Sequence, residues 1–117
     1  EALRLQPDDA VTHNALGAVY GGTGRSAEAI EHYREAARLD PRLFEARANL
    51  GRTLLDDGGD EGKRVLHELA LDLLRDGQLE PALQHIEAVL RRDPQYAPAR
   101  ATLEQLAART RARNLPR

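Results

Sequence analysis

Residues 10–41 read AVTHNALGAVYGGTGRSAEAIEHYREAARLDP. Their apolar residues recur every three or four positions, in two segments separated by the glycine-rich stretch at 21–24, which predicts two helices joined by a tight turn. The unit also repeats itself. Residues 1–7 read EALRLQP and residues 35–41 read EAARLDP, while Leu16-Gly17 returns as Leu50-Gly51, both at an offset of 34 residues. The chain is therefore built from helical repeats.

This unit resembles the tetratricopeptide repeat (TPR), a helix–turn–helix of 34 residues. The residues that carry the resemblance are Leu16, Gly17 and Tyr20 on the first helix, and Ala29, Tyr33, Ala36 and Pro41 on the second. His13 stands where the family usually has a bulky aromatic residue. The resemblance implies an all-α fold: an α-solenoid of antiparallel helix–turn–helix hairpins, with about six helices and an N-terminal partial helix.

The repeats divide one domain, residues 1–117, into unequal parts. We predict the tail of a preceding repeat at 1–7, a complete repeat at 8–41, a repeat lacking its second helix at 42–60, a further repeat at 61–94, a capping helix at 95–112 and a tail at 113–117. Because the first repeat is incomplete, we expect that the array comes from a longer one or that its start is not represented.

The spacing between the second and third repeats is too short. Gly51 and its counterpart Ala70 are 19 residues apart instead of 34, so about one helix and a turn are missing near residues 57–62. Either the helix at 63–76 follows the helix at 42–56 directly, or residues have been lost at this joint. The sequence slightly favours lost residues, although short-loop antiparallel packing allows the direct connection.

Composition excludes several functional classes. The 117 residues carry a net charge of -2 with 31% charged residues, which gives no general reason to bind nucleic acid or an anionic membrane. No apolar run approaches the roughly 20 residues of a membrane span. With no cysteine, the compartment stays open, and the cytoplasm is slightly favoured. Basic residues are almost all arginine, which we interpret as the codon bias of a GC-rich, bacterial genome.

The TPR resemblance implies a concave groove, lined by the first helix of each hairpin, that binds a peptide or protein partner. The implied groove positions are Val11, Asn14, Ala18, Glu45, Ala48, Asn49 and Arg52, with Arg64, His67, Glu68 and Leu71 on the later helix. Asn49 matches best, since an asparagine before the Leu-Gly pair binds ligand backbone in some members of the family, and an amide both donates and accepts. The chain is thus predicted to be a protein-interaction scaffold. Two alternatives are an accessory, substrate-recruiting domain of a larger enzyme and a self-assembling module, that is, a homo-oligomer.

No residue pattern predicts a catalytic, cofactor or metal site. Ser26 is the only serine and has no evident base. No two of the four histidines are three or four residues apart, and the acidic stretch at 56–61 lacks the alternate spacing of a calcium loop. We therefore expect no cofactor and no enzymatic activity.

Overall fold

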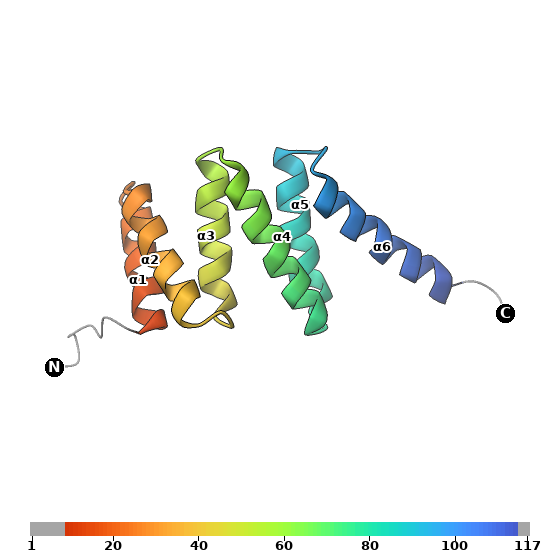
Figure 1. Cartoon of the computed structure of the whole chain (residues 1–117), viewed down its shortest axis with the longest axis horizontal. Coiled ribbons are helices and arrows are strands. Elements are labelled where there is room, and N and C mark those ends of the chain that lie inside the picture. Colours follow the sequence, from red (N-terminus) through yellow and green to blue (C-terminus); the bar gives the residue numbers. More distant parts are fainter. Residues whose placement is uncertain (1–8, 115–117) are drawn as a thin grey trace.

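The structure is a computed structural model that describes residues 9–114, and these form six α-helices and no strand. The helices are α1 (Ala10–Gly22), α2 (Ser26–Leu39), α3 (Phe44–Asp56), α4 (Asp60–Arg75), α5 (Leu79–Arg92) and α6 (Ala97–Arg113). They stack side by side into an elongated array of 64 × 29 × 18 Å, and α6 points away from the stack (Figure 1). The predicted all-α array of about six helices is confirmed; the partial helix expected at 1–7 lies outside the described residues.

Two kinds of connection join the helices. The α1–α2, α3–α4 and α4–α5 turns each contain one glycine with a positive φ, at Gly24, Gly58 and Gly77, a conformation that other residues adopt only with strain. The α2–α3 and α5–α6 links instead begin with Asp-Pro, at 40–41 and 93–94. Consequently α4 follows α3 directly and belongs to two hairpins, as partner of α3 and as partner of α5.

Helices in the first two hairpins approach each other closely at a glycine. A Cβ atom on Gly17 would lie 2.5 Å from the ring of Tyr33, and one on Gly51 would lie 2.5 Å from Leu66. At Gly62 of α4 the neighbour is backbone, since a Cβ there would lie 2.5 Å from the backbone nitrogen of Leu55, which cannot rotate away as a side chain can. The α3–α4 pair therefore packs in the same way as α1–α2, with Leu66 in the position of Tyr33.

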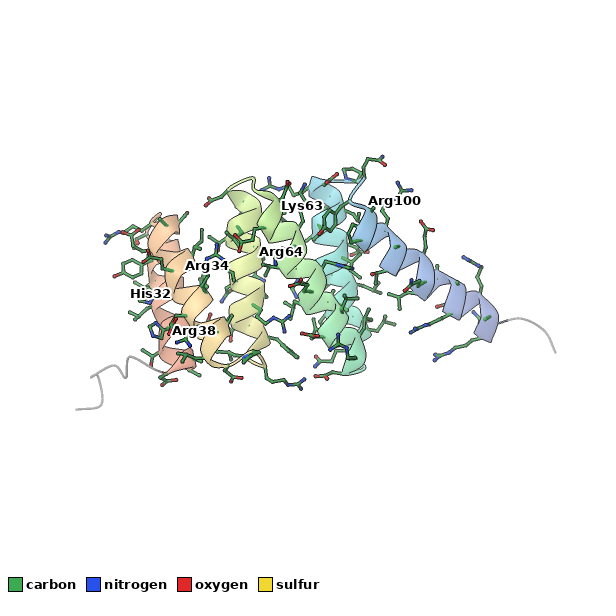
Figure 2. All side chains as sticks on the ribbon, in the orientation of Figure 1. His32, Arg34, Arg38, Lys63, Arg64 and Arg100 are labelled. Carbon is green, nitrogen blue, oxygen red and sulfur yellow. The ribbon has the colours of Figure 1, made fainter. Side chains whose placement is uncertain are left out.

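The helices form two layers. In one layer, the Asn49 side chain of α3 donates a hydrogen bond of 3.0 Å to Asn14 of α1, and Arg92 of α5 pairs with Asp56 of α3 at 3.1 Å. In the other, Arg34 of α2 binds the Glu61 carboxylate of α4 through two nitrogens. Figure 2 labels Arg34, together with Lys63 and Arg64 of α4, on this second layer. Thus α1, α3 and α5 share one face, and α2 and α4 share the other.

The hydrophobic core of the described residues consists of three clusters, and the largest lies around α4 and α5. Leu66 and Leu69 of α4 are fully buried, as are Ile86 and Val89 of α5. Smaller clusters continue the core towards α1, around Tyr33 and around Ala36. No helix in the described part of the chain is both long and apolar enough to span a membrane.

Candidate partner-binding groove

A groove of about 680 Å³ runs across the face formed by α1, α3 and α5. Its walls come from the C-terminal half of α1 and from most turns of α3, and α5 closes one side. The lining residues are Ala18, Gly21, Gly22, Tyr33, Glu45, Asn49, Arg52, Thr53, Leu55, Asp56, Ala88, Arg91 and Arg92. A volume of this size is typical of ligand and peptide sites.

A chain of side-chain hydrogen bonds crosses the groove from α1 to α3. The Asn49 amide nitrogen donates to the Asn14 oxygen at 3.0 Å, and the Asn49 oxygen accepts from the Arg52 guanidinium. The second Asn49 N–H, the Asn14 NH₂ and the remaining Arg52 N–H groups can still donate to a ligand, and each of the two amide oxygens keeps a second lone pair. Donors outnumber acceptors among these groups, so the network favours carbonyl or carboxylate oxygens on the ligand, while the amide oxygens can accept from its N–H groups.

Tyr33 contributes a phenol to the groove from α2. The residue is only 5% exposed, and within the described part of the chain its hydroxyl makes no hydrogen bond. Burial raises the pKa of Tyr33, an effect that the Arg52 charge partly offsets. The hydroxyl therefore stays protonated and adds a further donor.

The α5 side of the groove is basic. Arg92 is paired with Asp56, whereas Arg91 has no ion pair among the described residues. His85, also on α5, has a pKa lowered first by burial and then by the positive charge of Arg52. The imidazole is thus neutral near pH 7, and the positive charge on this side comes from the arginines.

The structure brings together five of the seven residues predicted as the main groove positions. Ala18, Glu45, Asn49 and Arg52 line the groove, and Asn14 is bonded to Asn49. Arg64 and His67 lie elsewhere, because α4 is in the other layer. Arg64 lies 3.9 Å from both Glu61 and Glu68, and the His67 Nε2 atom lies 2.8 Å from the Thr102 hydroxyl of α6.

The wider set of implied positions divides in the same way. Ala48 is 8% exposed and belongs to the core, so its assignment to the groove surface is wrong. Glu68 and Leu71 share α4 with Arg64 and are absent from the groove lining. Conversely, sequence reasoning missed Ala88, Arg91 and Arg92 on α5. The signal that could have found them is the 19-residue spacing: if α4 follows α3 directly, α5 becomes the next helix on the face of α1 and α3.

A polar contact between α1 and α2 was also not predicted from the sequence. The Nδ1 atoms of His13 and His32 lie 3.0 Å apart, and the His32 ring stacks on Tyr20 with centroids 5.4 Å apart. One Nδ1 must therefore carry a hydrogen and donate the hydrogen bond, which the other Nδ1 accepts. The pair links the two helices of the first hairpin, and across the described residues no group of three or more potential metal ligands occurs.

The two-layered stack of antiparallel hairpins, with a groove on one layer, defines the chain as an α-solenoid. Comparison with known families agrees: residues 22–58, which span α2, α3 and the start of the α3–α4 turn, match the family described as TPR repeat. The resemblance to the tetratricopeptide repeat is thus confirmed for this segment of the chain.

Several curated relatives share part of this chain. The peroxisomal targeting signal receptor of Candida albicans is 42% identical over 57 residues, and that of Saccharomyces cerevisiae is 40% identical over 57 residues; each match includes 49% of this chain. The protein CTR9 homolog of Arabidopsis thaliana is 29% identical over 109 residues, which include 77% of this chain. The chain spans about a tenth of the length of these relatives.

Proposed function

We propose that this chain is a non-catalytic scaffold that holds an extended segment of a protein partner in the groove of α1, α3 and α5. The observation that carries the proposal is the Asn14–Asn49–Arg52 network, which retains unused N–H donors for a ligand. An extended peptide presents a carbonyl oxygen at every residue and carboxylates on its acidic side chains or its C-terminus. Such a ligand can accept hydrogen bonds from these donors, and its binding requires no catalytic step.

Two further findings support a peptide as the ligand. The match to the TPR repeat family includes α3, which supplies Glu45, Asn49 and Arg52. Two of the relatives are by name receptors for a targeting signal, and they share about half of this chain. Glu45 and Arg52 on α3, together with Arg91 on α5, give the groove mixed charge, so selection among peptides would follow the order of acidic and basic residues along the segment.

Peptide selection by phage display tests this proposal. The wild-type chain should enrich peptides that share a motif, and their affinity, measured by fluorescence anisotropy, should fall roughly tenfold or more in an Asn49→Ala/Arg52→Ala variant. An Arg64→Ala/Glu68→Ala variant is the matched control, since it also removes two polar helix residues but lies on the other layer. A motif whose affinity is the same in both variants would mean that the groove is not the binding site.

A further inference from the structure

A separate cleft opens where α6 leaves the stack. Two adjoining hollows, of about 350 and about 220 Å³, lie between α6 and the end of the α4–α5 hairpin, and they share Leu74, Leu106 and Arg109. The larger hollow extends to Leu79 and Arg113, and the smaller reaches Thr102. No lining residue of this cleft belongs to the groove of α1, α3 and α5.

The floor of the larger hollow is apolar. Leu74 and Leu106 are partly buried and pack against the core cluster. Leu79, the first residue of α5, remains 48% exposed although it lines a concavity. A leucine in a hollow gains most from an apolar side chain that fills it and removes both surfaces from water.

The rim of the hollow is basic. Arg109 and Arg113 are one helical turn apart on α6, and within residues 9–114 neither has an acidic partner. Arg75, on the α4 side of the smaller hollow, is paired with Asp72 at 3.0 Å. Along its whole length, α6 carries four arginines and a single acidic residue, Glu104. The cleft therefore combines an apolar floor with an uncompensated positive edge.

We propose that this cleft docks a short acidic amphipathic helix of a partner protein. Along α6 the cleft runs from Thr102 to Arg113, about 17 Å at 1.5 Å per residue, which matches roughly three turns of a second helix. Such a helix would place leucine-like side chains against Leu79 and Leu106, and carboxylates at three- or four-residue spacing against Arg109 and Arg113. This site is independent of the proposed groove.

A synthetic helix of about 12 residues tests the proposal, with leucines on one face, glutamates on the other and a fluorescein label. Anisotropy titration should show binding to the wild-type chain, and a version with lysine in place of every glutamate should bind roughly tenfold more weakly or worse. Arg109→Glu/Arg113→Glu should weaken the acidic helix by roughly tenfold, and Leu79→Ser by several-fold. Since all three residues are exposed, circular dichroism should show these variants folded.

Matched controls separate docking from general attraction. Arg111→Glu reverses one charge on α6 outside the hollow, half the change made by the double variant, and Asn49→Ala/Arg52→Ala alters the other groove; both should leave affinity within about twofold. Equal binding of the acidic and basic helices, or an equal loss in Arg111→Glu, would overturn the proposal. So would a dimer, seen by light scattering, that Leu79→Ser dissociates, because a second copy would then fill the cleft.

Discussion

The α1–α3 region and the α3–α5 region contain the same kind of hairpin but use it differently. In the first, α1 and α2 form one hairpin, and an Asp-Pro link starts the next at α3. In the second, glycine turns stand on both sides of α4, so one helix completes the hairpin begun by α3 and begins the hairpin completed by α5. The difference shows that the turn before a helix, and not its sequence signature alone, decides which face the helix occupies.

The shared helix is also joined by ion pairs to both of its neighbours. Lys63 of α4 donates to Asp93 at the end of α5 at 2.9 Å, and Asp72 accepts from the 16%-exposed Arg47 of α3 at 2.7 Å. By contrast, Val11 and Val19 of α1 are 63% and 61% exposed. Because α4 packs against both α3 and α5, we expect it to couple these two helices into one folding unit.

The largest expected effect comes from Leu66→Ala in the shared helix. Leu66 is fully buried, faces Gly51 and belongs to the core cluster of α4 and α5, so its truncation should cost about 2–5 kcal/mol of unfolding free energy. Urea denaturation followed by circular dichroism measures this loss. Leu16→Ala on α1, where Leu16 is only partly buried, is the matched control and should cost less. Equal losses would remove the special position of α4.

Gly62→Ala tests the close approach of α3 and α4. Its Cβ would meet the Leu55 backbone at 2.5 and 2.8 Å, which no side-chain rotation relieves, so we expect a loss of about 1–3 kcal/mol despite the better helix propensity of alanine. Gly22→Ala, at the end of α1 with no atom within 4 Å, should be neutral or slightly stabilising. A stable Gly62→Ala variant would show that α3 and α4 pack less closely.

Sequence reasoning reached the fold because its signals are local. Gly17, Tyr33 and the 34-residue offset specify a hairpin and its neighbour, and small residues at the close contacts leave few alternatives. The face of α4 was harder to predict, because Leu66 and Leu69 fit either position of a hairpin. If α4 is the second helix of a hairpin, the small residue at the close helix contact is Gly62, which precedes the two leucines. If α4 is a first helix, that small residue is Ala70, which follows them.

The predicted groove residues therefore come together only as far as the chain stays regular. Asn14, Asn49 and Arg52 lie in one network, since α1 and α3 are first helices of successive units. Arg64 was assigned by taking the helix after the short joint as the first helix of a new repeat, whereas it is the second helix of the hairpin begun by α3. The contact of His13 with His32 escaped detection because it depends on the rotation of two helices about their axes, which spacing along one helix does not encode.

Replacing one arginine on each layer by alanine tests whether the binding face is that of α1, α3 and α5 or that of α2 and α4. Arg91 lines the groove from α5, whereas Arg64 lies on α4. For a peptide selected by the wild-type chain, Arg91→Ala should weaken binding by roughly five- to tenfold, as for loss of one charged hydrogen bond, and Arg64→Ala should have no effect. Anisotropy titration of the two variants measures this. The reverse order would place α4 on the binding face and contradict the layer arrangement.

The smallest expected effect is on the pH dependence of the α4–α5 region. Burial lowers the pKa of His67 on α4 and of His85 on α5. With folded pKa values below that of the unfolded chain, about 6.5, the unfolded state binds protons first. Stability is therefore complete above that pH and is lost as pH falls through the folded pKa values.

Urea denaturation at pH 7.5 and pH 5 should thus show a lower unfolding free energy at pH 5, by less than about 1 kcal/mol because both side chains stay partly in water. In a His67→Gln/His85→Gln variant this difference should shrink, since glutamine does not titrate and its amide at position 67 retains a donor for Thr102. Carboxylates contribute little in this range, because their unfolded pKa values lie near 4. An unchanged difference in the variant would assign the pH dependence to groups other than these two histidines. It would also contradict the inference that burial in the shared hairpin keeps their imidazoles neutral.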